Sequence, residues 1–229
     1  MIKYLQLPFQ FDVASMLREV GQLDKANWKE HYQKLHYTGD WNAIPLRSIG
    51  GAHDNIYISP LADPDYADTI YLEQCTYIRE VLETFKCPLL AVRLLKLDAG
   101  AIIKEHRDAE LSFEHGEIRL HIPVITHEDV EFYLDKERMH LEEGECWYMN
   151  FNLLHNITNN SPVNRIHLVI DAVVNDWVKE IFNSPGVTIK KEIPDATEKY
   201  SPAVKKQMIA MLRDMNTPVS NKMADDMEK

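Results

Sequence analysis

The sequence predicts a mainly β protein whose core is a double-sheet jelly roll, with helices packed outside it. Between Leu89 and Val174, short runs rich in Val, Ile, Leu and Tyr alternate with turn residues. A doubly wound α/β fold would need a helix between successive strands, and no segment in this region has that pattern. The 229 residues are enough for one domain with a complete core.

The first 88 residues are expected to be mostly helical, with turn-rich interruptions. Apolar residues recur at steps of three and four between Asp65 and Phe85, a spacing that predicts a helix with one buried stripe: Tyr71, Cys75, Ile78, Leu82 and Phe85. Pro64 and Pro88 bracket this segment. Residues 41–60 contain a Gly-Gly pair and two prolines, which indicate loops and short strands.

The central region, residues 89–177, carries the predicted jelly roll. Its six expected strands are residues 89–97, 118–125, 130–134, 138–141, 145–150 and 165–174. Turn signals separate them at residues 98–100, 134–136, 143–144 and 159–162. Residues 1–177 are therefore expected to form a single domain, with a helical part at 1–88 and the jelly-roll core at 89–177.

Residues 178–229 are expected to form a helical extension. Ser201 and Pro202 suit the N-cap and first position of a helix. The apolar face that follows could cover the core or a partner subunit, so an oligomer is possible: Val204, Met208, Met211, Leu212 and Met215. The last nine residues, NKMADDMEK, lack an apolar period and are expected to fray.

Composition excludes some classes of partner. Lys and Arg number 25 against 36 Asp and Glu, a net charge of −11, which disfavours nucleic acid as a partner. No run of about 18 apolar residues suggests a membrane span, and the N-terminus does not resemble a signal peptide. The three cysteines, Cys75, Cys87 and Cys146, are scattered and odd in number. We therefore expect a cytoplasmic protein with no membrane partner.

Seven of the ten histidines lie between His106 and His167, and spacing separates them. Side chains at i and i+2 of a strand share a face, which pairs His106 with Asp108, Arg119 with His121, and Arg165 with His167. The remaining histidines outside these pairs, His155 excepted, are expected to be ordinary core or surface residues.

His106, Asp108 and His155 together offer two imidazoles and one carboxylate. These ligands can occupy one face of a six-coordinate metal and leave three open positions, as non-haem Fe(II) requires when it binds a cosubstrate and O₂. Zinc more often takes a tetrahedral site, and neither HExxH nor CxxC is present. Arg165, ten residues after His155, could bind the far carboxylate of 2-oxoglutarate through its planar fork.

At this point the sequence resembles a known family. The segments LDAGAIIKEHRD, GEIRLHIPVIT and LEEGECWYMNFNLLHNITNNSPVNRIHLVID, in this order, resemble the aspartyl/asparaginyl β-hydroxylases, which are Fe(II)- and 2-oxoglutarate-dependent dioxygenases. The likeness runs from about Arg93 to Trp177, with a fainter echo in HYTGDWNAIPLRS. It implies a double-stranded β-helix, cupin-like core and a dioxygenase domain at residues 1–177.

The resemblance also implies a reaction and roles for individual residues. O₂ would convert 2-oxoglutarate to succinate and CO₂ while a C–H bond of the substrate is hydroxylated. His106 and His155 match metal ligands, and Arg165 matches the arginine for the C5 carboxylate. His121 matches a histidine near the C1 carboxylate, and Arg119 matches an arginine that binds a substrate carboxylate. Arg93 also has a counterpart, and Arg93 and Trp41 are weaker candidates for the pocket wall.

Two positions refine the expected substrate. The intact His-Arg-Asp that ends at Asp108 looks like the bacterial branch that includes hydroxylases of free L-proline, since animal members lack the acidic ligand. Glu117 replaces a second arginine with which protein-acting members hold an acidic side chain, and a carboxylate there would repel an Asp substrate.

The sequence thus predicts a hydroxylase of an amino acid, free or in a small peptide or metabolite. The cofactor set is Fe(II), 2-oxoglutarate and O₂. Two alternatives remain open at this point. One is hydroxylation of Asp, Asn or another residue in a protein, and the other is a non-catalytic jelly-roll module that binds a carboxylated metabolite.

Overall fold

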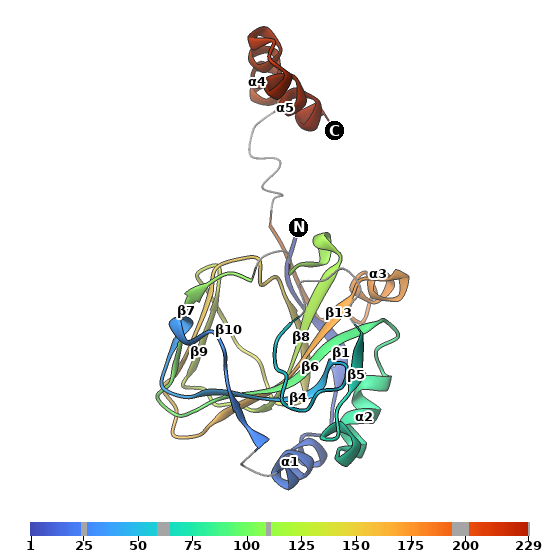
Figure 1. The fold of residues 1–229 in the computed structure, drawn as a ribbon, viewed down its shortest axis with the longest axis vertical. Coiled ribbons are helices and arrows are strands. Elements are labelled where there is room, and N and C mark those ends of the chain that lie inside the picture. Colours follow the sequence, from blue (N-terminus) through green and yellow to red (C-terminus); the bar gives the residue numbers. More distant parts are fainter. Residues whose placement is uncertain (24–26, 59–64, 109–110, 194–201, 229) are drawn as a thin grey trace. The chain divides into compact units, whose positions relative to one another are not determined.

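Two facing β-sheets form the core of the protein (Figure 1). The computed structural model describes residues 1–23, 27–58, 65–108, 111–193 and 202–228. The nine-stranded sheet has the order β14 (Ile189–Glu192), β1 (Ile2–Gln10), β11 (Glu145–Met149), β8 (Glu117–Ile125), β13 (Arg165–Val173), β6 (Leu89–Leu97), β4 (Trp41–Ile49) and β2 (Lys29–Glu30), and β5 (Tyr66–Asp68) pairs with β4. The five-stranded sheet has the order β10 (Glu137–Met139), β9 (Val130–Leu134), β12 (His155–Asn159), β7 (Ile102–His106) and β3 (Tyr37–Thr38).

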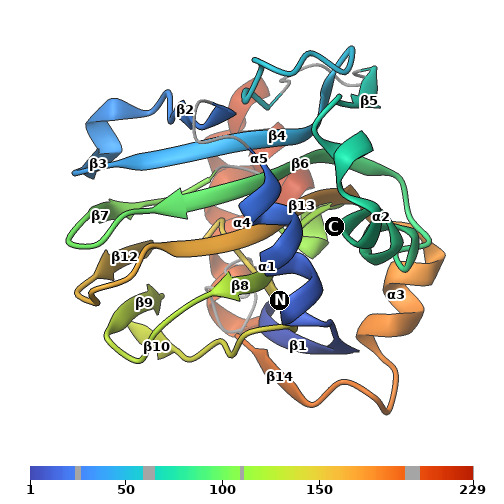
Figure 2. The same ribbon diagram turned by 90° about the horizontal axis from the view of Figure 1, so that it is seen from below.

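The predicted fold class, a mainly β jelly roll with flanking helices, is confirmed. All strand pairs with a described register are antiparallel, and Figure 2 shows β4, β6, β13 and β8 running side by side. The six predicted strands all exist, with ends that differ by at most two residues.

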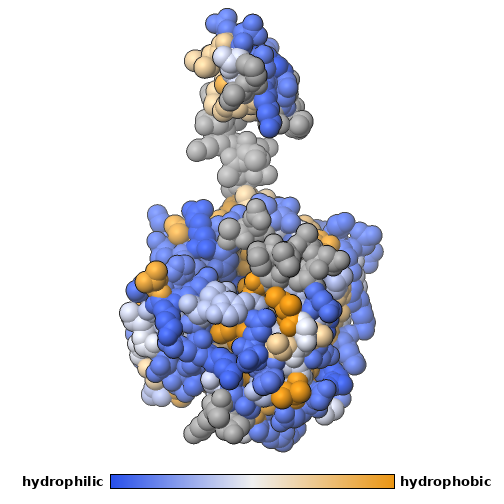
Figure 3. Space-filling view, in the orientation of Figure 1, coloured by the Kyte–Doolittle hydropathy of each residue, from blue (hydrophilic) through white to orange (hydrophobic). Residues whose placement is uncertain are grey.

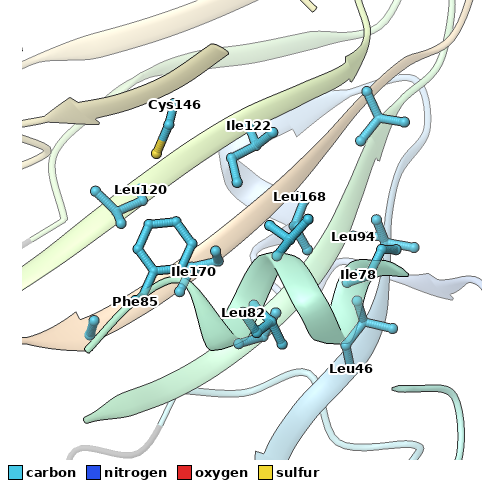
Figure 4. Close-up of a cluster of buried hydrophobic side chains, with 14 of the residues drawn as sticks. Leu46, Ile78, Leu82, Phe85, Leu94, Leu120, Ile122, Cys146, Leu168 and Ile170 are labelled. Carbon is cyan, nitrogen blue, oxygen red and sulfur yellow. The ribbon is translucent and has the colours of Figure 1, made fainter. Parts of the chain in front are cut away.

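The large sheet is buried on both faces, which produces two separate cores. On β13, Ile166, Leu168, Ile170 and Ala172 face a core shared with the helices, part of which is drawn in Figure 4. The alternate residue Val169 belongs to a second core between the two sheets. Because side chains alternate along a strand, Arg165, His167 and Asp171 also lie on the face that looks between the sheets.

Three helices cover the outer face of the large sheet (Figure 1): α1 (Val13–Gln22), α2 (Thr76–Glu83) and α3 (Asp176–Phe182). Asp12 caps α1 by accepting a hydrogen bond from the backbone N of Ala14 at 3.0 Å. The buried carboxylate of Glu19 on α1 accepts from the backbone N atoms of Tyr77 and Ile78, at 2.6 and 2.9 Å. Two otherwise unpaired donors at the start of α2 are satisfied in this way.

The prediction of a mostly helical part at residues 1–88 is wrong. β1 and β4, each nine residues long, extend the large sheet on its two sides. Their apolar runs lack strict alternation because buried strands contact a core on both faces. The helix expected at 65–85 is also shorter, since α2 is preceded by β5 and the 3₁₀ turn η3 (Leu72–Gln74). All five residues of its predicted stripe are nevertheless buried.

Within the central region, the structure adds two strands that the sequence did not predict, β7 and β12. They pair with each other, with His155 directly opposite His106. The short 3₁₀ helices η2 (Lys34–His36) and η4 (Phe113–His115) lie in the connections.

Residues 192–229, together with Met1, form a second compact unit, so the first unit ends at residue 191 and not at 177. The second unit contains α4 (Pro202–Met215) and α5 (Pro218–Glu228). The expected fraying of the last nine residues is wrong, because α5 includes them up to Glu228. Met211 and Met215 of the predicted apolar face are 69% and 65% exposed, while the proposed N-cap Ser201 lies outside the described residues.

Hydrophilic residues dominate the face of the molecule shown in Figure 3, where they surround a few separate apolar patches. Within the described part of the chain, no helix has the length and apolar character needed to cross a bilayer.

Candidate active site

Two histidines and one aspartate converge between the sheets. The ligand atoms of His106, Asp108 and His155 all lie within 4.8 Å of one another. The histidines come from neighbouring strands β7 and β12, and the Asp108 backbone N, just after β7, donates to the carbonyl of Phe151 at 2.9 Å. The three residues that the sequence predicts as metal ligands are therefore brought together.

Backbone carbonyls select the tautomer of both histidines. His106 Nδ1 lies 2.8 Å from the carbonyl of Lys104, and His155 Nδ1 lies 3.0 Å from that of Leu153. A carbonyl only accepts hydrogen bonds, so each Nδ1 carries the proton and each Nε2 keeps its lone pair for a metal.

The electrostatics of the triad also suit a cation. Burial lowers the pKa of His155 to about 4, so this imidazole is neutral near pH 7. Burial alone would raise the pKa of Asp108, but Arg119, His155 and His106 outweigh it and hold that pKa below its usual value. A neutral imidazole and an ionised carboxylate are the forms that bind metal.

Asp108 belongs to a buried chain of charges. Arg119 Nη1 donates to Asp108 Oδ2 at 2.5 Å, while its Nε and Nη2 donate to the two oxygens of Asp171 at 2.6 and 3.1 Å. Arg93 Nη2 donates to the same Asp171 at 2.9 Å. Burial would lower the pKa of Arg119, but Asp171 and Asp108 reverse this and raise it.

Arg165 occupies a different setting, although it is equally buried. It is 3% exposed, and its Nη2 lies 3.1 Å from His167 Nδ1. No carboxylate of a described residue pairs with it, and burial lowers its pKa to about 9. A buried cation without a counter-ion is costly, and an anionic ligand could reduce that cost by pairing with it.

His121 and His167 continue this polar region. Their Nδ1 atoms are 3.3 Å apart, and neither Nε2 has a hydrogen-bond partner among the described residues. Burial lowers the pKa of both histidines well below 6.5, with Arg165 as the next cause. His121 also stacks on Phe151, at 5.0 Å between ring centroids.

A cavity of about 290 Å³ is lined by the triad, Arg119, Arg165 and His121, but not by His167. Its lining contains every residue that the sequence predicts for the site: His106, Asp108, His155, Arg165, His121, Arg119, Arg93 and Trp41. Trp41 forms part of the wall and stacks on His31 at 3.5 Å between centroids. Glu117, which is exposed, contributes to the same lining.

Comparisons with known proteins agree with this geometry. Residues 11–174 match the family model described as aspartyl/asparaginyl beta-hydroxylase. The chain belongs to this family. It is 26% identical over 164 residues to the L-proline cis-4-hydroxylase of Rhizobium meliloti (strain 1021), covering 71% of this chain and 58% of that protein. It is 24% identical over 176 residues to L-proline cis-3-hydroxylase 2 of a Streptomyces species, and the match covers 75% of this chain and 60% of that protein.

The predicted likeness to bacterial proline hydroxylases within this family is thus confirmed. The chain spans about three fifths of the length of these relatives. Among solved structures, it resembles the non-haem α-ketoglutarate-dependent carbocyclase SnoK from nogalamycin biosynthesis, with a TM-score of 0.50 and 9% identity. That match covers 75% of this chain and 79% of the other, and it supports the fold.

Asp171 and His31 are among the cavity residues that the sequence did not predict. Asp171 lies on the face of β13 that already holds Arg165 and His167, so alternation extended by two more steps would have found it. His31 had no assigned role, yet it is buried in the cavity wall, and burial lowers its pKa to about 3. No spacing signal links His31 to the central strands, because it precedes β4 in an irregular segment.

Proposed function

We propose that this protein is an Fe(II)- and 2-oxoglutarate-dependent dioxygenase that hydroxylates a free amino acid or a small amino-acid-like molecule. One observation carries the proposal. A two-His, one-Asp cluster shares a single cavity with Arg165, a buried guanidinium that has no carboxylate partner among the described residues. Membership of the hydroxylase family supports the same conclusion.

The cluster fits Fe(II) by its donors. His106 and His155 would each present a neutral Nε2, and Asp108 would present Oδ1 while Arg119 holds its Oδ2. Bound Fe(II) supplies the activation of O₂ that couples 2-oxoglutarate decarboxylation to hydroxylation. His106, Asp108 and His155 would be its protein ligands, beside the cavity that would hold the cosubstrate.

Arg165 and His121 would bind the cosubstrate. The guanidinium of Arg165 pairs with the C5 carboxylate of 2-oxoglutarate, and the fork geometry suits two parallel hydrogen bonds. His121 lines the same cavity as Arg165 and the triad. Its Nδ1 donates to His167 Nδ1, which also accepts from Arg165, so the Nε2 of His121 would bind the C1 carboxylate only when that nitrogen is protonated. Relief of the uncompensated buried charge favours dicarboxylate binding over a neutral ligand.

The remaining charges suit a zwitterionic substrate. Arg93 and Arg119 share the single carboxylate of Asp171, so once Asp108 binds metal this pair retains about one positive charge for a substrate carboxylate. Glu117 offers a negative charge to an amine, and Trp41 offers an apolar wall to a ring or aliphatic chain. L-proline has a carboxylate, an amine and an apolar ring, and it is therefore the first substrate to test.

The experiment is an assay of succinate formation with Fe(II), 2-oxoglutarate and a panel of free amino acids that includes L-proline. We expect succinate and a product 16 Da heavier with at least one of them. Glu117→Gln should raise the KM for that amino acid more than it lowers kcat, because the proposal places Glu117 beside the amine and not beside the reacting carbon. A panel without any product would reject the proposal.

The alternatives predict different outcomes of the same assay. A hydroxylase of protein Asp or Asn would give product with peptides and none with free amino acids. A binding module without turnover would bind 2-oxoglutarate and consume no O₂. The volume of about 290 Å³ favours a small substrate, since ligand pockets range upward from about 300 Å³.

A further inference from the structure

A buried carboxylate outside the metal cluster, Asp171, contacts two arginines and no metal ligand directly. It is 2% exposed, and its oxygens accept hydrogen bonds from Arg119 Nε, Arg119 Nη2 and Arg93 Nη2. A buried ion pair contributes little net stability compared with apolar residues of the same size. A contribution to stability is therefore a weak account of why this carboxylate lies beneath the cavity.

Asp171 fixes the orientation of Arg119. The two residues are directly opposite each other on β13 and β8. The carboxylate of Asp171 accepts hydrogen bonds from two of the three guanidinium nitrogens of Arg119, Nε and Nη2. A guanidinium is planar and rigid, so two such bonds also determine where the third nitrogen points.

The third nitrogen, Arg119 Nη1, reaches the metal cluster. It donates to Asp108 Oδ2 at 2.5 Å, while Asp108 Oδ1 lies 3.7 Å from His106 Nε2. Asp108 follows the end of β7, and its side chain is 23% exposed, so packing alone restrains it less than the two histidines. One oxygen of Asp108 is thereby held by Arg119, and the other is directed toward the imidazoles.

We propose that Asp171 is a positioning residue for metal binding, which acts through Arg119 on Asp108. Asp171 orients Arg119 and offsets its positive charge, and Arg119 then presents Asp108 to the metal through a single oxygen. The inference rests on the proposed function, because it takes His106, Asp108 and His155 as the metal site.

Asp171→Asn is the direct perturbation. The amide keeps the size of the side chain but loses the charge and one acceptor, so Arg119 loses its paired contact and its positive charge faces the metal site. Both effects weaken metal binding. Changes to residues that hold metal ligands typically cost about 10- to 100-fold in metal affinity, and we expect a loss in this range.

The test is a double-mutant cycle on Co(II) affinity, with Co(II) alone as an air-stable substitute for Fe(II) and its visible absorption as the signal. Asp171→Asn should weaken Co(II) binding at least about 10-fold in the native background. In the Asp108→Ala background, Asp171→Asn should weaken Co(II) binding clearly less than in the native background, because the orienting effect on Asp108 is gone and only the charge of Arg119 remains. Equal losses in the two backgrounds, or no loss in the native one, would overturn the proposal.

Glu19→Gln is the matched control, since it neutralises another buried carboxylate outside the cavity and should leave Co(II) affinity unchanged. If Asp171→Asn does not fold, Arg119→Lys replaces it in both backgrounds. A lysine has a single ammonium nitrogen, which cannot make the hydrogen bonds to Asp171 and Asp108 that the three guanidinium nitrogens make. The same pattern of losses is then expected, and equal losses again overturn the proposal. Neither 2-oxoglutarate nor an amino acid is present in this titration, so its result is independent of whether hydroxylation is found.

Discussion

Replacing Arg165 by methionine should make the protein without ligands more stable and its 2-oxoglutarate binding weaker. The structure gives the size of the first effect. Burial lowers the pKa of Arg165 from 12.5 to about 9, and 1.36 kcal/mol per tenfold change converts this to about 5 kcal/mol of unfavourable charge burial. The contact with His167 offsets about 1–2 kcal/mol, and imperfect packing of methionine offsets a similar amount.

The net expectation for Arg165→Met is a gain of about 2 kcal/mol in the free energy of unfolding. For a unit of this size, that corresponds to a melting temperature roughly 4–8 °C higher. Urea denaturation without metal or 2-oxoglutarate measures the gain. The KM for 2-oxoglutarate, or its Kd by calorimetry, should rise at least about 100-fold, since a charge-assisted bidentate pair is lost.

Arg47→Met is the control, because Arg47 does not line the cavity and pairs with Asp68 at 2.5 Å. It should give no gain in stability and no change in 2-oxoglutarate affinity. An Arg165→Met protein that is less stable than the native one and binds 2-oxoglutarate normally would refute the role of Arg165 as an unpaired anion receptor.

Three further predictions follow from the same structure. Asp108→Ala should lower kcat for succinate formation by at least about 1,000-fold while the circular dichroism spectrum is unchanged, and full activity would contradict the triad. The pKa of His31 is about 3 in the folded state and 6.5 in the unfolded state. Above pH 6.5, His31 should therefore not affect the free energy of unfolding. That free energy should fall by about 3 kcal/mol toward pH 4, because there only the unfolded state binds the proton. In metal-free urea titrations, His31→Gln should flatten this pH dependence, whereas an unchanged slope would argue against a neutral buried His31. Leu168→Ala removes a fully buried side chain of the helix-side core and should cost about 2–5 kcal/mol in unfolding free energy without changing the KM for 2-oxoglutarate, and a raised KM would show that the two cores are not independent.

The central strands were predictable from the sequence because their apolar runs are long and their turns are explicit. β13 is an example, since all its residues from Arg165 to Ala172 are buried and six of its nine residues are apolar. β7 and β12 lacked that signal. β7 reads IIKEH and β12 reads HNITN, and such short polar strands depend on their neighbours for stability rather than on their own patterns.

The candidate site was predictable to the extent that spacing along the chain encodes it. His106, Asp108, His155 and Arg165 stood out by residue type and order, and the cavity contains all four. The link from Arg119 to Asp171 was not predictable, because it depends on the register between β8 and β13, which the sequence does not state.

The wrong prediction of a mostly helical part at residues 1–88 has a related cause. The helical stripe from Tyr71 to Phe85 was identified correctly as buried, but β1 and β4 were not recognised as members of the sheet. A strand buried between helices on one side and a second sheet on the other shows no period of two, so pattern alone cannot separate it from a buried helix.

Hydroxylation of a free amino acid is tested most directly by measuring O₂ consumption and succinate formation together, when L-proline or another free amino acid is added to the protein with Fe(II) and 2-oxoglutarate. We expect one succinate for each hydroxylated amino acid, and no product from the His155→Ala protein. Normal metal and 2-oxoglutarate binding without any amino-acid product, across all free amino acids, would contradict this expectation.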